Sequence, residues 1–339
     1  TAYTYQWFSA NVNNTSSGIA IVGETNATFI PPTNSAGTTY YYCLISQING
    51  ASCAVTTTTS EVIINLAPAI NNQPISSSVC VNETPTLLSF TYTNGVGTPT
   101  YQWFSNNVNS NSGGTIISGA TNPTFAPSAI FAGTLYYYCV VTFASLSGGC
   151  SVITTLPASV VVNPNPVIAS ETATICSTTA FTVSPTNSGG NIVPVGTTYT
   201  WTNPTVSPVG SVTGASAEGI PQTNISQTLI NTTTNPSTVT YTVTPKSGTC
   251  VGNNFSVVVT VNPSINPNSI LKNSTCFGAN NGSIQTTITG GVPFSSGNPY
   301  NISWTGPNGF TASTSNITNL SPGDYTLSVL DNGGCPFSK

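Results

Sequence analysis

The chain has 339 residues and a formal net charge of −4, and only 3% of its residues are charged, against roughly 25% in an average soluble protein. It contains no His, Arg or Met, and its three Lys are far apart, which argues against a nucleic-acid partner, because binding to phosphates needs clustered cations. Without His the chain lacks the commonest acid–base group of enzymes. The low charge does not indicate disorder, because a hydrophobic share of 38% is enough for packed cores. No apolar run approaches the roughly 18 residues of a membrane span.

The chain opens on a predicted strand at residues 1–5, and the segment around it is repeated later. Residues 4–43 align without a gap with residues 100–139, at an offset of 96, and such internal similarity is typical of repeat proteins. Both copies begin with TYQWFS and end with YYYC. The first copy lacks the third that precedes this segment in the second, so we expect the chain to begin inside a domain.

Two looser copies follow, which gives four units. A cysteine stands near the start of each later unit and another follows a Gly-containing turn near its end; these are Cys80, Cys176 and Cys276, then Cys150, Cys250 and Cys335. The expected domains are residues 1–66, Ig-like with its N-terminal part missing; 67–164, Ig-like; 165–264, Ig-like or PKD-like; and 265–339, a repeat domain of its own kind.

The local patterns predict an all-β chain of tandem immunoglobulin-like β-sandwich domains. Thr, Val, Ile and Tyr dominate, Gly, Pro and Asn interrupt them every few residues, and no segment has the apolar period of a helix. Residues 159–162 and 257–261 are predicted last strands, and each is followed by an Asn-Pro pair. Because proline fixes φ and cannot extend a ladder, we expect short, semi-rigid seams and an extended rod.

The cysteines are expected to form structural disulfides in an oxidising compartment, since there is no CxxC pair and no His to complete a zinc site. If each domain is closed on itself, the pairs are Cys80–Cys150, Cys176–Cys250 and Cys276–Cys335. Cys43 and Cys139 are then buried thiols, and the partner of Cys53 lies upstream. A rival pairing joins Cys139 to Cys150 and Cys43 to Cys53, and leaves Cys80 free.

The aromatic residues are expected mainly in the cores. One tryptophan occurs in each unit, which is typical of a ring that fills the space between two sheets; these are Trp7, Trp103, Trp201 and Trp304. Neighbouring side chains on a strand alternate between its faces, so Tyr41 and Tyr137 are expected to face inward. Tyr40, Tyr42, Tyr136 and Tyr138 are then expected to face outward, as candidates for a contact surface.

The acidic residues do not form a catalytic pair. The closest two, Asp324 and Asp331, flank one strand at an odd spacing, which puts them on opposite faces. We therefore expect turn and strand-end roles for both; the alternative is a calcium site completed by backbone carbonyls. No enzyme activity, no catalytic or metal site and no cofactor are predicted.

The last unit carries motifs of a known repeat. It opens with Cys276-Phe277-Gly278-Ala279, has Trp304 in the middle, and closes with LSPGDYTLSVLDNGGC from Leu320 to Cys335. This pattern resembles the SprB repeat of large surface proteins of gliding Bacteroidota, over residues 274–335; the earlier units resemble the Ig-like modules that accompany it. The resemblance implies a long adhesin, exported by the type IX secretion route, displayed on the outer membrane and moved by the gliding machinery.

The leading interpretation is a structural repeat segment of an extracellular adhesin filament that serves gliding motility or surface attachment. Its partners would be surface glycans or solid substrata. One alternative is a glycan- or protein-binding module of a secreted multidomain protein. A second is a subunit of a self-assembling surface sheath, because low charge reduces repulsion between neighbouring molecules.

Overall fold

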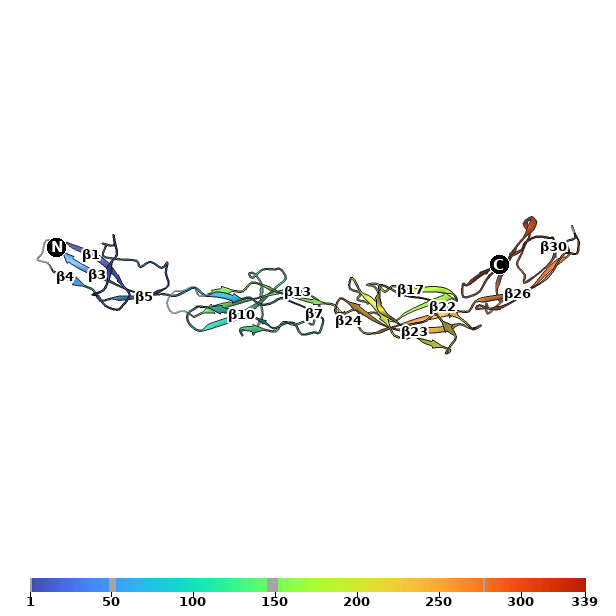
Figure 1. Ribbon diagram of the computed structural model, residues 1–339, viewed down its shortest axis with the longest axis horizontal. Helices are drawn as coiled ribbons and strands as arrows, with labels where there is room; N and C mark the ends of the chain where they lie inside the picture. Colours follow the sequence, from blue (N-terminus) through green and yellow to red (C-terminus); the bar gives the residue numbers. More distant parts are fainter. Residues whose placement is uncertain (1, 49–52, 145–151, 277) are drawn as a thin grey trace. The chain divides into compact units, whose positions relative to one another are not determined.

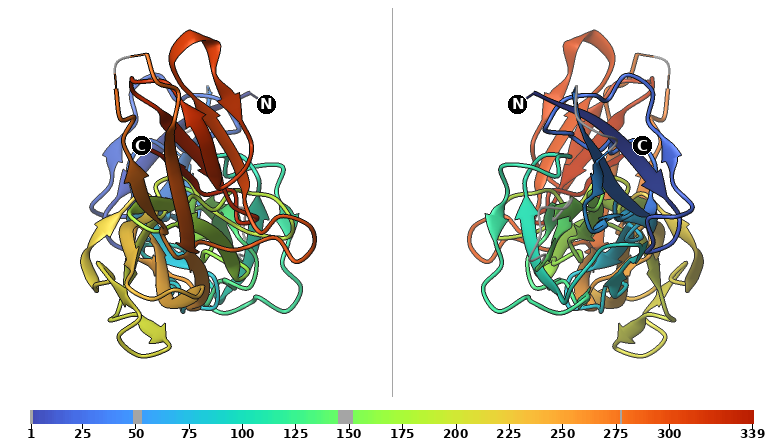
Figure 2. Two further views of the ribbon diagram at one scale, coloured as in Figure 1. Left: turned by 90° about the vertical axis from the view of Figure 1, so that its right-hand side faces the viewer. Right: turned by 90° about the vertical axis from the view of Figure 1, so that its left-hand side faces the viewer.

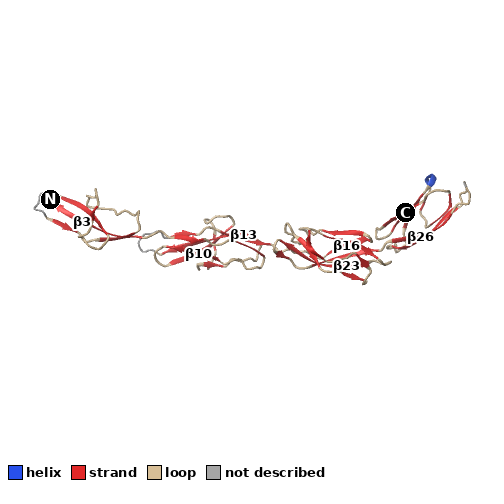
Figure 3. Cartoon of the chain, in the orientation of Figure 1, coloured by secondary structure: helices blue, strands red, loops and turns tan. Residues whose placement is uncertain are grey.

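The computed structural model describes residues 2–48, 53–144, 152–276 and 278–339 (Figure 1). Within these ranges the chain is built of β-strands and their connections, with one 3-10 turn, η1, at Pro307–Gly309 (Figure 3). The prediction of an all-β chain of tandem Ig-like domains is confirmed. The chain divides into two compact units, Thr1–Val162 and Asn163–Lys339, and each is described by itself.

The first part of the N-terminal unit is a single sheet. Its strands are ordered β2-β1-β3-β4, with β5 also paired to β3; they are β1 (Tyr3–Ala10), β2 (Ile19–Ala20), β3 (Gly37–Gln47), β4 (Ala54–Thr56) and β5 (Ser60–Ile64). Trp7 lies opposite Cys43 in the ladder. Among the described residues no second sheet packs on this one, so Trp7 is half-buried and the expectation of a core position for it is wrong.

The second part of this unit is a two-layer sandwich. One layer has the order β11-β10-β13-β15-β7, with β14 paired to β13, and the other contains the pairs β12–β8 and β6–β9. The strands are β6 (Ala69–Asn72), β7 (Ser77–Cys80), β8 (Leu88–Ser89), β9 (Thr91–Thr93), β10 (Pro99–Asn106), β11 (Thr115–Ile116), β12 (Thr124–Phe125), β13 (Gly133–Phe143), β14 (Val152–Thr154) and β15 (Ala158–Asn163). Leu88, Trp103, Val141 and Val160 lie in the core between the layers.

The C-terminal unit begins with a larger sandwich. Its main sheet has the order β16-β25-β23-β18-β21, with β19 and β24 paired to β23, and β17-β22-β20 form the facing layer; Figure 1 shows β17 and β22 on one side and β23 on the other. The strands are β16 (Glu171–Cys176), β17 (Thr179–Val183), β18 (Thr198–Trp201), β19 (Thr205–Ser207), β20 (Val212–Thr213), β21 (Glu218–Gln222), β22 (Ile225–Asn231), β23 (Ser237–Ser247), β24 (Cys250–Val251) and β25 (Phe255–Asn262). β16 runs parallel to β25.

The chain leaves β25 and enters the last sandwich after two residues. One sheet is β26-β27-β30 and the other is β29-β28-β31-β32; these strands, orange to red, lie together in both views of Figure 2. They are β26 (Ile265–Lys272), β27 (Gly282–Gly290), β28 (Asn301–Thr305), β29 (Thr311–Ala312), β30 (Asn316–Leu320), β31 (Thr326–Leu330) and β32 (Pro336–Ser338). Ile265, at the seam, is part of this core.

The other predicted core aromatics lie in the cores. Trp103, Trp201 and Trp304 are buried, and each indole Nε1–H donates to a backbone carbonyl, of Asn122, Ser216 and Thr314 respectively, at 2.9–3.0 Å. Tyr41 and Tyr137 are buried as well. Each of the three indoles therefore contributes apolar area to its core while its N–H donor is satisfied.

Tyr42 and Tyr138 are also buried, so the prediction that they face solvent is wrong. Tyr138 stacks on Phe104 with ring centroids 5.2 Å apart, and its hydroxyl accepts a hydrogen bond from the Gly114 N–H at 3.1 Å. A Cβ at Gly114 would come within 2.9 Å of the Tyr138 ring. The segment before β11 thus lies on the outer face of β13, and glycine permits that approach. Among the tyrosines expected outward, only Tyr40 and Tyr136 are partly exposed.

Candidate functional site

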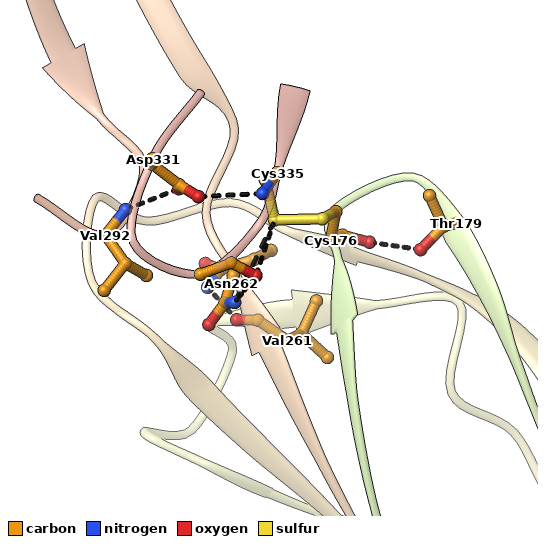
Figure 4. The surroundings of a disulfide bond; sticks show 9 residues. Cys176, Thr179, Val261, Asn262, Val292, Asp331 and Cys335 are labelled. Atoms are coloured by element: carbon orange, nitrogen blue, oxygen red, sulfur yellow. Dashed lines mark hydrogen bonds between the residues drawn. A yellow bond between two sulfur atoms is a disulfide. The ribbon is translucent and has the colours of Figure 1, made fainter. Parts of the chain in front are cut away.

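A disulfide joins the two sandwiches of the C-terminal unit. Cys176, at the end of β16, bonds to Cys335, which stands just before β32, with a Cα–Cα distance of 5.5 Å and a sequence separation of 159 residues. Figure 4 shows the bridge where the first sandwich meets the last hairpin of the second. The expectation that each domain is closed on itself is therefore wrong for this unit.

Cys176 does not pair with Cys250, because the two lie at opposite ends of one sheet. Cys176 stands opposite Asn262, the last residue of β25, whereas Cys250 pairs with Ser247 beyond the other end of that strand. At ~3.3 Å per residue, β25, with its eight residues, puts about 25 Å between them. A disulfide spans at most about 7 Å between Cα atoms.

Cys276 does not pair with Cys335 for the same reason. The hairpin of Cys335 lies at the seam, where the Asn332 N–H donates to the Val292 carbonyl at 2.8 Å. Strand β26 runs away from the seam, and Cys276 follows its far end, where the thiol is free and exposed. The prediction of a structural disulfide at Cys276 is wrong. Cys80 and Cys250 are both disulfide-bonded, and Cys150 lies outside the described residues.

Asp331 holds the Cys335 hairpin in place. Its side chain is buried; Oδ1 accepts from the Cys335 N–H at 2.8 Å and Oδ2 from the Val292 N–H at 2.7 Å (Figure 4). Hydrogen bonds to a carboxylate are roughly twice as strong as neutral ones. Because these N–H groups occupy both carboxylate oxygens, Asp331 stabilises the turn that carries Cys335, which is the role expected for a strand-end residue.

Asn262 fills the seam beside the bridge. It is buried, and its Nδ2 donates to the Gly333 carbonyl at 3.5 Å and contacts Cys335 Sγ at 3.9 Å (Figure 4). A Cβ at Gly333 would lie 2.4 Å from that nitrogen, so any larger residue there would displace the Asn262 side chain. A side chain of the first sandwich is thus packed against the backbone of the second.

A further polar cluster fixes the end of the first sandwich below the bridge. The Ser177 N–H donates to the Asn262 carbonyl at 2.9 Å, and the Asn231 side chain donates to the Val261 carbonyl at 2.8 Å. Thr179 Oγ1 donates to the Cys176 carbonyl at 2.6 Å (Figure 4). Buried polar groups with all partners in place make a rigid support, so both cysteines are held in position from their own domains.

We expect removal of the Asp331 charge to loosen this hairpin. In Asp331→Asn one oxygen becomes an NH2 group, which cannot accept, so one of two buried N–H groups is left unpaired at a cost of about 1–3 kcal/mol. Faster hydrogen exchange at the Val292 and Cys335 amides would report the loss. Asp324→Asn is the matched control, because Asp324 is exposed; equal effects of the two substitutions would contradict this role.

The remaining described cysteines are free thiols, which rules out the rival pairing. Cys43 and Cys139 are buried, and Cys53 is exposed. Cys139 is fully buried beside Trp103, and its N–H is bound to Thr155 Oγ1 at 2.9 Å. Burial raises the pKa of the Cys139 thiol from 9.0 to about 12. This residue therefore acts as a small apolar group of the core.

The raised pKa of Cys139 predicts a loss of stability at alkaline pH. Between pH 9 and 12 the unfolded chain releases this proton and the folded chain keeps it, so the unfolding free energy falls as pH rises, by at most about 1.4 kcal/mol per pH unit. Urea unfolding over this range should show a smaller decrease in Cys139→Ala. Iodoacetamide at pH 8 should label Cys53 and Cys276 in the folded chain and spare Cys139; prompt labelling of Cys139 would contradict the burial.

The described residues contain no cluster of three or more His, Cys, Asp or Glu side chains that could hold a metal ion. The acids are apart, since Asp324 is exposed and Asp331 is used by the hairpin. No helix in the described ranges is long and apolar enough to cross a membrane.

The candidate functional site is the bridged seam, which is formed by Cys176, Asn262, Asp331 and Cys335. The sequence placed Asn262 at a seam but did not predict that its side chain packs against the Cys335 hairpin.

Comparisons with known proteins place two segments in families. Residues 173–265 match the PKD-like domain family, and residues 71–164 match a domain of unknown function, DUF8696. No curated protein sequence matches this chain. With its all-β fold and the PKD-like match, the chain as a whole is a tandem Ig-like repeat protein.

The solved structures to which the chain is similar include multidomain proteins. The chain is similar to Sidekick-1 immunoglobulin domains 1–5, with 11% identity, a TM-score of 0.33, and coverage of 99% of this chain and 73% of that one. It is also similar to Protocadherin Gamma B2 extracellular cadherin domains 3–6, with 11% identity, a TM-score of 0.37, and coverage of 99% of this chain and 90% of that one. A third similar structure is that of chicken CNTN1 FN1–FN3 domains, with 11% identity, a TM-score of 0.28, and coverage of 81% of this chain and 98% of that one.

Proposed function

We propose that this chain is a structural, load-bearing segment of an extracellular surface adhesin, with its Ig-like domains serving as spacers. The observation that carries the proposal is the Cys176–Cys335 bridge, which ties one sandwich covalently to the next. Disulfides persist in oxidising compartments outside the cytosol. A bond between neighbouring domains adds nothing to either core, but it resists their separation, as a displayed thread requires.

The surface chemistry supports a spacer role. With 3% charged residues and a net charge of −4, the chain offers neither a charged docking patch nor a set of acid–base groups, so we propose no catalytic role. The SprB resemblance of residues 274–335 supports the finer proposal of an outer-membrane filament of a gliding bacterium, exported by the type IX route. Contacts with glycans or solid substrata would then be made elsewhere along the filament.

Antibodies raised against this chain provide the test. On intact cells that carry the gene we expect gold label along surface threads, and mild external protease should remove it. Label confined to the cell interior would refute surface display. Deletion of the gene should abolish surface spreading or attachment; a deletion strain that glides normally but no longer attaches would refute the gliding part alone.

A further inference from the structure

We propose that Cys276 is the site of a further bridge between domains, in which its sulfur bonds to the hairpin cysteine of another Ig-like domain. The bond between Cys176 and Cys335 supplies the pattern, since it joins a cysteine at the end of the first strand of one sandwich to the cysteine of the last hairpin of the next. The inference deepens the proposed load-bearing function and rests on it for the oxidising compartment.

Cys276 holds the same place in the last sandwich as Cys176 does in the sandwich before it. Each cysteine comes after the first strand of its sandwich, β16 or β26, and before the second, β17 or β27. β17 begins beside the end of β22, and β27 begins beside the end of β30, where Gly282 lies opposite Leu320. Cys276 therefore lies at the end of its sandwich that corresponds to the bridged end of the other.

Among the three described cysteines at this place, Cys276 alone has no bond. Cys80 ends β7, which lies beside β15, just as Cys176 ends β16, which lies beside β25. Both of these cysteines are disulfide-bonded, whereas Cys276 is a free and exposed thiol. An exposed thiol in an oxidising compartment is open to irreversible oxidation. The two bonded equivalents thus point to a sulfur partner for the third.

An open cavity lies next to the turn that carries Cys276. Its volume is about 440 Å³, and its lining consists of residues 271–274, 282–284 and 320–325. The Ser274 hydroxyl connects the cavity to the turn, because it donates to the Cys276 carbonyl at 3.5 Å. At the corresponding end of the previous sandwich, the Cys335 hairpin packs against the buried Asn262 side chain (Figure 4). The cavity therefore gives an incoming hairpin a place to pack beside the thiol.

Formation of the bond needs two thiols and an oxidant, for which we name the disulfide of an extracytoplasmic thiol oxidoreductase. The Cys276 thiolate attacks one sulfur of that disulfide and releases the other as a thiolate; the partner thiolate then attacks the Cys276 sulfur and releases the oxidoreductase. The two cysteines lose two electrons and two protons, and the oxidoreductase becomes a dithiol. The exposure of Cys276 gives the oxidant access to its sulfur.

Disulfide mapping of the full protein, taken from cells that carry the gene, tests the inference. The cells are lysed in denaturant with N-ethylmaleimide, which blocks free thiols, and pepsin digestion at acid pH then prevents exchange because thiolates are absent. We expect Cys276 in a cross-linked peptide pair whose second cysteine follows a Gly-containing turn, as Cys335 does. A second peptide that contains Cys53 would identify a second copy of this chain, and any other such peptide a further domain. Cys139, a buried free thiol, is the matched control and should carry maleimide.

Cys276 that carries maleimide, is bonded to glutathione or is joined to another Cys276 would overturn the inference. Cys276→Ser provides a second measurement: the partner cysteine identified in the pair should then carry maleimide, while the Cys176–Cys335 pair persists. A partner cysteine that stays bonded in this variant would also overturn the inference. Surface label together with a free Cys276 would refute this inference alone, whereas interior label together with a bonded Cys276 would refute the proposed function alone.

Discussion

Trp103→Ala is expected to destabilise its sandwich by about 3–5 kcal/mol, the range for removal of a buried large aromatic ring. The Trp103 side chain is fully buried. Phe90 packs on it edge-to-face at a centroid distance of 5.9 Å, and Phe125 stacks at 5.8 Å. Leu88 and Phe90, from the layer opposite β10, close the space around the ring. Alanine would leave a cavity that rings from two sheets cannot fill.

Trp7→Ala provides the matched comparison, because Trp7 occupies the same repeat position. Trp7 is half-buried, with Phe29 at a centroid distance of 5.5 Å and an indole hydrogen bond to the Asn26 carbonyl at 2.9 Å. We expect less than half of the Trp103 effect, since the free energy scales with the apolar area that the side chain buries. Native-state hydrogen exchange of β13 and β3 amides measures each effect in its own domain; equal losses would contradict the difference in packing.

The difference between these tryptophans shows what the repeat pattern could predict and what it could not. The spacing of Trp, Tyr and Cys predicted the strands and the inward rings of Trp103, Trp201 and Trp304, because period-two alternation and one large ring per sandwich are local rules. The burial of Trp7 depends on a facing sheet, and no residue near Trp7 in sequence reports on that. Likewise, Tyr138 was expected outward because alternation does not reveal a loop that folds back over a strand.

The disulfide pairing could not be predicted from the sequence for a similar reason. Cys176 and Cys335 each have an equivalent in the neighbouring unit, so pairing within units and pairing between consecutive units fit the spacing equally well. The pairing is decided by the lengths of β25 and β26. Each strand separates the two cysteines of its own domain, whereas Cys176 and Cys335 both lie at the seam between the two domains. The Asn-Pro pair marked a seam at Asn262 but gave no signal for its contact with Cys335, because an Asn before a proline is typical of many turns.

Loss of the bridge is expected to destabilise both sandwiches of the C-terminal unit. While the first sandwich stays folded, the bond closes a loop from Asn262 to Cys335, 73 residues apart, in the unfolded form of the second. The chain-entropy estimate for such a loop is about 4 kcal/mol. The Cys176→Ser, Cys335→Ser variant should therefore lose most of the protection of β27, β30 and β31 amides against hydrogen exchange. Amides of β22 and β23 should lose protection as well, because the same bond closes a loop from Cys176 to Ile265 when only the first sandwich unfolds.

The reduced wild-type chain is the critical control, because it separates a tether from a packing effect. A tether acts on the unfolded form of either sandwich, so reduction of the wild-type chain should reproduce the variant without any substitution. Damage to packing at the seam would instead appear in the variant and be absent from the reduced wild type, and would extend to Asn231 and Ser177, which support β25. Unchanged amide protection in both the variant and the reduced wild type would contradict the restriction of the unfolded chain by the bond.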